Sequence, residues 1–336
     1  MKDIDLDLKR LVQGQGRGAY SWTRDHAKWE KMCAFAKEIH AAGYKIGKAS
    51  NLKERHIRGA VDKMKQRGVS DARIMNLMSG ARSWAAMAGK PNVVPSNKDL
   101  GLSRGKEQRQ AEKDQSRKLQ EVKEKLMEKI KDPGAKAAAD IQTRLMARPS
   151  EGGFGLRAEE AAKFKPGHEA RNDKTGASTK AIDWKAGQVN LVSEYKNGQP
   201  RCNWTKGGRP RQIPITNEKQ AQTLKDAEAL AKSNPKGSTT PTDKLVEWMK
   251  YMGDRARAAG LGKADSASGA AGPFHSLRHG YVHERYQEIT GQPPPVLGGP
   301  GVLPEAAREG LMALSEEIGH GRLEVLKEYL GDFEIK

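Results

Sequence analysis

The sequence predicts an α+β protein with an all-α N-terminal domain, followed by a mainly helical domain that contains a small antiparallel β-sheet. Three observations lead to this fold class. Apolar residues recur at helical spacing through about the first hundred residues. The segment KPNVVPSNKDLGL, residues 90–102, then breaks that pattern with two prolines and a glycine. Short strand patterns with Asn-Gly and Gly-Gly turns follow in the second half of the chain.

The N-terminal domain is predicted to be a small basic bundle of helices. Residues 26–43 and 51–68 each show an apolar stripe at helical spacing, and Gly43 supplies a stop for the first. Ser70 resembles the N-cap of a further helix that ends near Gly89. Such stripes are typical of core packing, so we expect no chemistry from their tryptophans. The expected core residues are Trp29, Met32, Ala36, Ile39, Ile57, Val61, Met64, Ile74, Leu77, Ala81 and Trp84.

A charged linker is predicted between the domains. The boundaries that we predict are residues 1–97 for the helical domain, 98–120 for the linker and 121–336 for the second domain. Both signs of charge are frequent in the linker, as is typical of a solvated segment. Apolar residues at steps of three and four follow, so a helix there should dock on the second domain. These residues are Leu119, Val122, Leu126 and Ile130.

The second domain mixes helices and strands. Residues 141–164 resemble two helical stretches with an interruption, and residues 181–216 resemble short strands. Helices return after Asn217. Residues 292–304, QPPPVLGGPGVLP, form a Pro/Gly-rich insertion between two helices, and we expect this insertion to lie outside the core.

The composition favours a nucleic-acid partner. Sixty Lys and Arg residues against 42 Asp and Glu residues give a formal net charge of +18, which favours binding to a polyanion. No apolar run approaches the roughly 20 residues that cross a bilayer, so we expect no membrane partner. The first residues, MKDIDLDLKR, do not resemble a signal peptide. The two cysteines, Cys33 and Cys202, argue against a disulfide framework, and we expect a cytoplasmic protein.

Three histidines in HSLRHGYVH, residues 275–283, could share one face of a helix. His275, His279 and His283 stand at four-residue steps, a spacing that zinc sites also use. Arg278 lies among them and no cysteine is near in the sequence, so packed or surface histidines are the better interpretation. We therefore expect no metal.

The segment KGGRPR, residues 206–211, could be interpreted in two ways. It resembles the basic core of peptides that bind the minor groove of DNA. Ile213 and Ile215 follow it in alternation, however, which favours the tip of a β-hairpin that carries Lys206. A basic hairpin tip is usually only solvated, so this segment alone predicts no function.

Five motifs occur in order along the second domain, and together they resemble the tyrosine recombinase, or phage integrase, family. They are GLRAEE with Arg157 and Glu160, TKGGRPR with Lys206, HSLRH with His275 and Arg278, IGH with His320, and Tyr329 nine residues further on. The resemblance spans about residues 141–330. The first hundred residues are similar to that family's helical core-binding domain, and the whole chain resembles integrases of bacterial integrative elements.

The resemblance implies a site-specific DNA recombinase that cleaves and rejoins DNA through a covalent 3′-phosphotyrosine, without a metal or a cofactor. Tyr329 would attack the scissile phosphate. Arg157 and Arg278 would bind the non-bridging oxygens through their planar guanidinium groups. The implied catalytic residues are Arg157, Lys206, His275, Arg278, His320 and Tyr329.

The remaining roles follow from the same resemblance. His275 and His320 would donate hydrogen bonds or transfer protons at the phosphate, and Lys206 would protonate the leaving 5′ oxygen. Glu160, one helical turn from Arg157, would have a structural role at the site and would not take part in the reaction. The partner would be double-stranded DNA, with four protomers on two sites at the nucleoid. Accessory DNA-bending or directionality factors are further candidate partners.

Two alternative functions stay open at this point. A type IB topoisomerase shares much of this chemistry and differs by relaxing DNA without exchanging strands. A DNA-binding protein that kept the fold but lost the reaction would act as an architectural or regulatory factor. Two features depart from the family pattern: few residues follow Tyr329, and the insertion at 292–304 lengthens the path from Arg278 to His320. We expect both to affect assembly more than chemistry.

Overall fold

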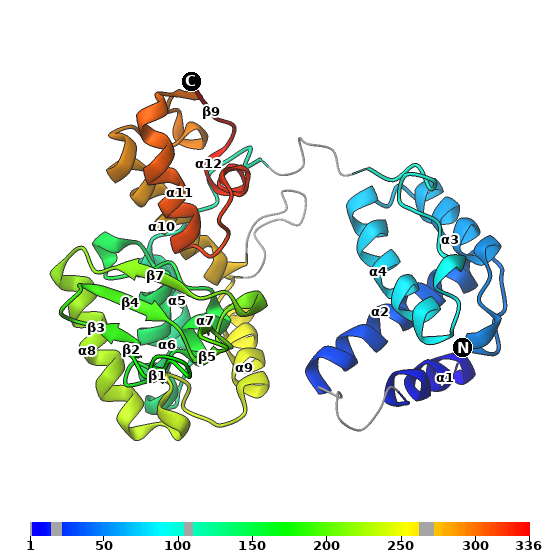
Figure 1. Cartoon of the computed structure of the whole chain (residues 1–336), viewed down its shortest axis with the longest axis horizontal. Helices are drawn as coiled ribbons and strands as arrows, with labels where there is room; N and C mark the ends of the chain where they lie inside the picture. Colours follow the sequence, from blue (N-terminus) through cyan, green and yellow to red (C-terminus); the bar gives the residue numbers. More distant parts are fainter. Residues whose placement is uncertain (1, 15–21, 104–109, 262–271) are drawn as a thin grey trace. The chain divides into compact units, whose positions relative to one another are not determined.

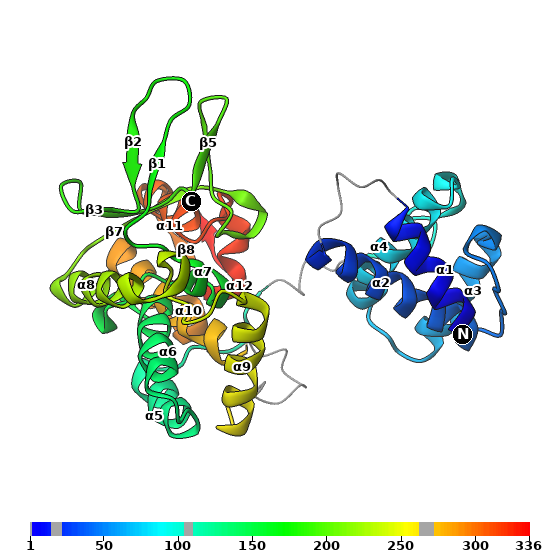
Figure 2. The same ribbon diagram turned by 90° about the horizontal axis from the view of Figure 1, so that it is seen from below.

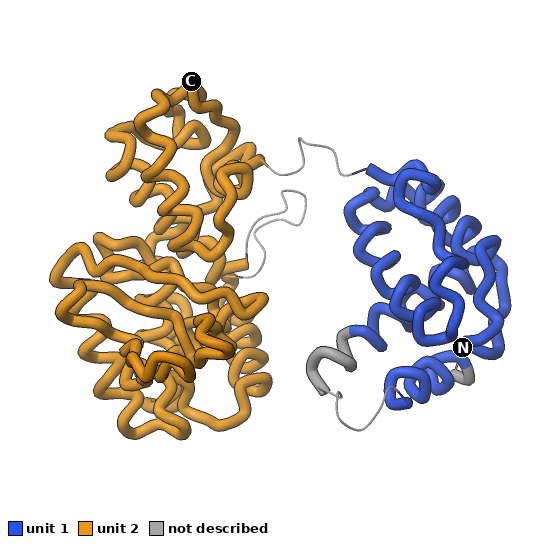
Figure 3. The backbone as a smooth tube through the Cα atoms, viewed as in Figure 1, with its two compact units in different colours: residues 1–108 blue, residues 109–336 orange. Residues whose placement is uncertain are grey.

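The chain folds into two compact units, residues 1–108 and 109–336 (Figure 3). The computed structural model describes residues 2–14, 22–103, 110–261 and 272–336. The boundary between the units lies within the segment that we predicted to be a linker, and part of that segment, residues 104–109, lies outside the described residues.

Unit 1 is helical (Figure 1). Its helices are α1 (Lys2–Gln13), α2 (Trp22–Ala41), α3 (Glu54–Gln66) and α4 (Asp71–Met87), with single turns η1 (Ala49–Asn51) and η2 (Pro91–Val93). Helix α2 contacts the other three helices. The predicted apolar stripes are confirmed as core, except that Trp29 is half-buried. Ser70 directly precedes α4 as predicted, but its side chain makes no capping hydrogen bond.

Unit 2 surrounds one large apolar core. Its α-helices are α5 (Leu119–Lys129), α6 (Pro133–Met146), α7 (Ala158–Lys163), α8 (Glu218–Ser233), α9 (Leu245–Ala258), α10 (Pro273–Thr290), α11 (Arg308–Glu317) and α12 (Lys327–Leu330). Its single turns are η4 (Pro149–Glu151), η5 (Lys206–Gly208), η6 (Pro235–Gly237), η8 (Pro295–Leu297), η9 (Glu305–Ala307) and η10 (Leu323–Val325). The predicted stripe of α5 is confirmed, because its apolar residues are buried against this core.

A three-stranded antiparallel sheet in the order β3-β4-β7 lies among these helices (Figure 1). The strands are β3 (Ile182–Asp183), β4 (Gln188–Leu191) and β7 (Arg211–Pro214). Val189 pairs with Ile213 and Leu191 pairs with Arg211, so these four side chains share the buried face of the sheet. The predicted α+β class, with a small antiparallel sheet after a helical N-terminal unit, is confirmed.

Two hairpins project together from unit 2 (Figure 2). They are β1 (Glu169–Arg171) with β2 (Ser178–Lys180), and β5 (Glu194–Lys196) with β6 (Gln199–Arg201). The carboxylate of Asp173 accepts hydrogen bonds from the backbone N–H groups of Asn197 and Gly198 at 2.8 and 2.7 Å. The Asn-Gly turn was predicted, whereas the β1–β2 hairpin was not.

Two predictions about unit 2 were wrong in detail. Strands β6 and β7 do not pair with each other, because β6 pairs with β5 and β7 pairs with β4. Lys206 therefore lies in a turn between two sheets rather than at a hairpin tip. The Pro/Gly-rich insertion is not wholly outside the core, since Leu303 is buried. Leu303 belongs to β8 (Val302–Leu303), which pairs in parallel with β9 (Glu334–Ile335). Among the described residues, none of the helices has the length and apolar character to cross a bilayer.

Candidate functional site

Arg157 begins the site at the N-terminus of the short helix α7. Its backbone N–H donates to the Glu160 carboxylate at 2.8 Å, and its guanidinium Nη1 donates to the same carboxylate at 2.8 Å. This arrangement is a capping box, in which the third helical residue reaches back to the residue before the helix. Glu160 thereby fixes both the main chain and the side chain of Arg157.

Glu160 lies at the centre of a buried cluster of arginines. Its side chain is 1% exposed and pairs with Arg211, whose own side chain is 2% exposed. Nη1 of Arg278 lies 4.0 Å from the carboxylate. Burial alone would raise the pKa of Glu160, but the charges of Arg211, Arg278 and Arg157 lower it to about 2. Burial lowers the pKa of Arg211 to about 10, so both partners stay charged at neutral pH.

Arg278 brings α10 and α12 together. It is fully buried, and its guanidinium donates to the backbone carbonyls of Gly155 and Ile318. Its Nε donates to the hydroxyl oxygen of Tyr329 at 3.3 Å. Tyr329 lies on α12 and is 3% exposed. A phenolic oxygen is thus held against a guanidinium group that is 51 residues away in the sequence.

The histidines of α10 form a row beside Tyr329. Ring centroids of His275 and His279 lie 5.6 and 4.7 Å from the Tyr329 ring centroid. His275 keeps solvent exposure, but its packed surroundings and the charges of Arg278 and Arg157 lower its pKa to about 4. Burial and the neighbouring histidines lower the pKa of His279 to about 3. The described residues contain no group of three or more His, Cys, Asp or Glu side chains that could hold a metal ion.

His320 closes the site from the segment after α11. Its Nε2 accepts a hydrogen bond from Nη2 of Arg157 at 3.0 Å, because a guanidinium group can only donate. Burial and the charges of Arg157, Arg278 and other arginines lower its pKa to about 4. The preceding Gly319 has a φ of +75°, and a Cβ there would lie 2.4 Å from Nη1 of Arg211. This position in the IGH motif therefore requires glycine.

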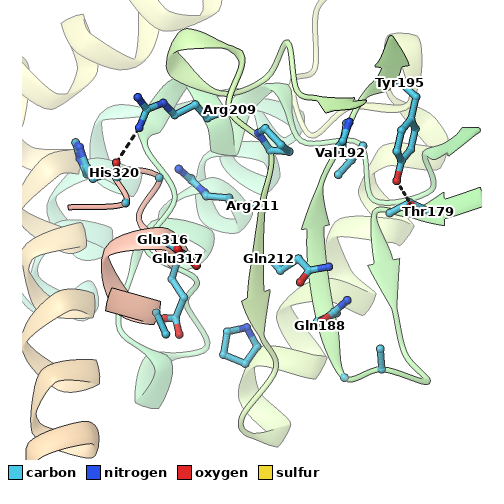
Figure 4. A pocket seen from close by; sticks show the side chains of 18 residues that line it. Thr179, Gln188, Val192, Tyr195, Arg209, Arg211, Gln212, Glu316, Glu317 and His320 are labelled. Atoms are coloured by element: carbon cyan, nitrogen blue, oxygen red, sulfur yellow. Dashed lines mark hydrogen bonds between the residues drawn. The ribbon is translucent and has the colours of Figure 1, made fainter. Parts of the chain in front are cut away.

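A groove of about 700 Å³ next to His320 is lined by residues of β4 and β7 and by the end of α11 (Figure 4). Arg209 and Arg211 line one end, and Gln188 and Gln212 lie along the strands (Figure 4). Nη1 of Arg209 donates to the backbone carbonyl of His320 at 2.7 Å. The groove therefore continues the arginine-rich site over a polar surface of the sheet.

Lys206 lies apart from the other predicted residues. It is exposed in η5, and no hydrogen bond or ion pair joins its side chain to another described residue. The next two residues, Gly207 and Gly208, have φ values of 79° and 73°, so the turn needs glycine at both positions. The Thr205 hydroxyl donates to the Arg209 carbonyl at 2.7 Å, which anchors the turn near the loop of His320.

The chain is similar to known integrases in its N-terminal region and in its fold. Residues 1–94 match the family model for the N-terminal region of phage integrases. The integrase of transposon Tn1549, solved with transposon right-end DNA, has a similar structure at 15% sequence identity and a TM-score of 0.50. That alignment covers 96% of this chain and 94% of the solved chain, which spans residues 82–397 of the Tn1549 integrase. The chain therefore shares its fold with a transposon integrase, and its first 94 residues resemble the N-terminal region of phage integrases.

Two further solved structures, of a site-specific recombinase and an integrase, are similar at lower scores. The XerH site-specific recombinase on its palindromic difH substrate is 14% identical, with a TM-score of 0.48, and the alignment covers 90% of this chain and 73% of XerH. A lambda integrase dimer bound to a core site is 12% identical, with a TM-score of 0.47. That alignment covers 98% of this chain and 95% of the solved lambda integrase chain. No curated protein sequence matches the chain.

The fold brings together five of the six predicted site residues and adds three that were not predicted as site residues. Arg157, His275, Arg278, His320 and Tyr329 are linked by the contacts above, whereas Lys206 is not. The additional residues are Arg211, His279 and His283. One sequence signal could have identified Arg211. It alternates with Ile213 and Ile215 along a predicted strand, so its side chain points to the same, buried face of the sheet as Ile213.

Proposed function

We propose that the chain is a site-specific DNA recombinase that cleaves and rejoins DNA through a covalent 3′-phosphotyrosine. The observation that carries this proposal is the Tyr329 hydroxyl held 3.3 Å from Nε of Arg278, inside a cluster that also contains Arg157 and His320. A tyrosine beside clustered guanidinium groups is suited to attack a phosphodiester, because the arginines stabilise the charge that develops on phosphorus-bound oxygens. The fold, shared with a transposon integrase, supports the same function.

The reaction needs no metal and no nucleotide cofactor. The Tyr329 oxygen attacks the scissile phosphorus and passes its proton to a neutral histidine ring of the site, while the bond from phosphorus to the 5′ oxygen breaks. The leaving 5′ oxygen takes a proton, which we assign to Lys206 in the exposed turn η5. The phosphotyrosine keeps the energy of the broken bond, so attack by a 5′ hydroxyl of a second strand can rejoin DNA.

Arg157 and Arg278 bind the non-bridging oxygens of the phosphate in this proposal. Planar guanidinium groups can offer paired N–H donors to such oxygens, and they stay charged at any biological pH. His275 and His320 are neutral at neutral pH because their pKa values are lowered to about 4. Each neutral ring carries one N–H donor and one acceptor, so it can bind or shuttle a proton at the phosphate.

Unit 1 serves as the DNA-clamping domain in this proposal, with residues 1–97 as the core-binding domain, 98–120 as the linker and 121–336 as the catalytic domain. The net charge of +18 supports a double-stranded DNA partner. Four protomers on two DNA sites form the working assembly, aided by a DNA-bending or directionality factor. We place the protein in the cytoplasm, at the nucleoid.

The test begins with the junctions of the genetic element that flank the gene, since their sequence supplies the core site. Wild-type protein on a nicked suicide duplex of that site should form an adduct that survives denaturation, and peptide mass spectrometry should locate it on Tyr329. Tyr329→Phe should bind the same duplex and form no adduct. Wild-type protein should also exchange strands between two intact duplexes of the core site.

Each contrary outcome points to a specific alternative. Binding without an adduct would favour an inactive DNA-binding protein with this fold. An adduct with relaxation of supercoiled DNA, but without strand exchange, would favour a topoisomerase. An adduct on another residue would move the nucleophile, although Tyr281 and Tyr286 are both fully buried.

A further inference from the structure

The helix that carries Tyr329 is too short to fix its own orientation. Helix α12 spans four residues, Lys327–Leu330, and a single turn gains too few internal hydrogen bonds to offset the entropy of ordering it. The last carbonyl groups of any helix also lack partners within the helix. The direction of the Tyr329 side chain must therefore depend on contacts from outside α12.

Two such contacts reach backbone carbonyl groups of α12. The backbone N–H of Ala111 donates to the carbonyl oxygen of Lys327 at 2.9 Å. Nε2 of His283 lies 2.8 Å from the carbonyl oxygen of Tyr329 itself. The first contact comes from the segment before α5, and the second comes from α10, which also carries Arg278. The Tyr329 main chain and the guanidinium group that binds its hydroxyl are thus held by the same helix.

The ring of His283 has a defined protonation state. A carbonyl oxygen only accepts, so Nε2 must carry a proton. The other nitrogen, Nδ1, is buried without a hydrogen bond among the described residues and lies 3.6 Å from the Asp114 carboxylate. Burial lowers the pKa of His283, despite the opposing effects of the Tyr329 carbonyl and Asp114. The neutral ring with its proton on Nε2 is therefore the form that holds Tyr329.

We propose that His283 is a positioning residue for the nucleophile, which acts by anchoring the main chain of Tyr329 through Nε2–H. This inference rests on the proposed function, because it matters for catalysis only if Tyr329 attacks DNA. His283 is buried at 5% exposure and does not face the groove, so it acts through Tyr329 rather than on the phosphate. Reaction rates depend steeply on the placement of the attacking atom, and a shift of about 1 Å can cost about 10²-fold.

Three variants of the full chain separate this role from general packing. His283→Leu removes the donor at similar volume, and His283→Gln keeps an N–H donor that can reach the Tyr329 carbonyl. Tyr286→Phe is the matched control, because it removes one buried hydroxyl without a partner among the described residues, three positions along α10. Melting temperatures check that all three variants fold.

The first measurement is the single-turnover rate of adduct formation on the suicide duplex at saturating protein. His283→Leu should react about 10²-fold more slowly with unchanged DNA affinity, while His283→Gln should recover most of the rate and Tyr286→Phe should match wild type. A rate for His283→Leu within about twofold of wild type would overturn the proposal. So would equal loss in the Leu, Gln and Tyr286→Phe variants, since that pattern indicates packing alone.

The second measurement does not require the reaction. Hydrogen–deuterium exchange of peptides that cover residues 323–331 should be about tenfold faster in His283→Leu than in wild type, the expected effect of one lost hydrogen bond. His283→Gln and Tyr286→Phe should exchange like wild type. Unchanged exchange in His283→Leu would overturn the anchoring role. If wild type forms no adduct, the proposed function fails, and the exchange data still decide whether His283 anchors Tyr329. Should His283→Leu not fold, His283→Asn replaces it, because its amide is too short to reach the carbonyl.

Discussion

Arg211 donates to the carboxylate of Glu160 inside the core of unit 2, where the two side chains are 2% and 1% exposed. The pair does more than neutralise two buried charges. The same carboxylate caps α7 and holds the guanidinium group of Arg157, which in turn donates to His320. The position of two proposed catalytic residues therefore depends on an ion pair that is itself buried in the core.

Breaking this pair from one side should be more destabilising than removing it altogether. Arg211→Met leaves the Glu160 carboxylate short of its main partner and should lower the free energy of unfolding by about 3 kcal/mol or more. The double variant Arg211→Met/Glu160→Gln should lose less than the sum of the two single variants. Urea unfolding of the wild type, the two single variants and the double variant measures the coupling between the two residues. If the losses of the single variants simply added up in the double variant, the prediction would be wrong.

Glu160 should also make the fold sensitive to acid. Its pKa in the folded state is about 2, below the ordinary value of 4.5. A lowered pKa contributes stability that is complete above the unfolded-state pKa and is lost as pH falls through the folded-state pKa. Between about pH 4.5 and 2, the wild type should therefore lose about 3 kcal/mol relative to Glu160→Gln. Denaturant unfolding of the wild type and of Glu160→Gln at a series of pH values tests this prediction. If the free energies of unfolding of the two proteins changed with pH in parallel, the prediction would be wrong.

The histidines of the site should be neutral in the protein without DNA. The pKa values of His275 and His320 are lowered to about 4, so neither ring should titrate between about pH 5.5 and 7.5. Because these values lie below the ordinary 6.5, the stability contributed by the neutral rings falls as pH decreases toward 4. NMR titration of labelled histidines, with each ring assigned by substitution, measures the pKa values of His275 and His320. A midpoint near 6.5 for either ring would contradict the prediction.

Lys206 should be required only when the leaving group needs a proton. Lys206→Ala should cleave ordinary DNA about 10²- to 10⁴-fold more slowly, the usual contribution of a positioned acid. A bridging sulfur in place of the 5′ oxygen leaves as a thiolate, whose parent thiol has a pKa near 8.5, so cleavage of that substrate should stay close to the wild-type rate.

Arg157→Ala is the control for this experiment, because its proposed role in binding the phosphate oxygens does not depend on which atom leaves. It should be slow on both substrates. If Lys206→Ala were equally slow on both, Lys206 would bind DNA or shape the site instead. Arg209, which contacts the His320 loop, would then be the next candidate for the acid.

Both units should contribute phosphate contacts. Each neutralised phosphate adds about −0.9 to the slope of log affinity against log salt on duplex DNA. The full chain should therefore show a steep slope, and a protein of residues 109–336 should show a shallower one. Fluorescence anisotropy over a range of salt concentrations measures both slopes. Equal slopes would exclude unit 1 as a clamp.

Local patterns predicted the helices well, because a stripe such as Ile57, Val61 and Met64 reports burial on one face directly. The site depends on contacts between distant segments. Arg278 and Tyr329 were placed together by resemblance, since spacing along the chain does not encode their 3.3 Å contact. Arg211 was missed because a buried arginine is stable only with its partner Glu160, 51 residues away. The predicted hairpin at Lys206 failed because β7 pairs with the more distant β4.

The four-residue helix that carries Tyr329 has a consequence for heat inactivation. Segments with few internal contacts open at a lower free-energy cost than the core around them. Tyr329 and Leu330 belong to the same core as α6 and α10, but α12 has only one turn, so as temperature rises α12 should detach before these longer helices do. Adduct formation would then cease several degrees below the melting temperature, and cooling would restore it without refolding of the domain.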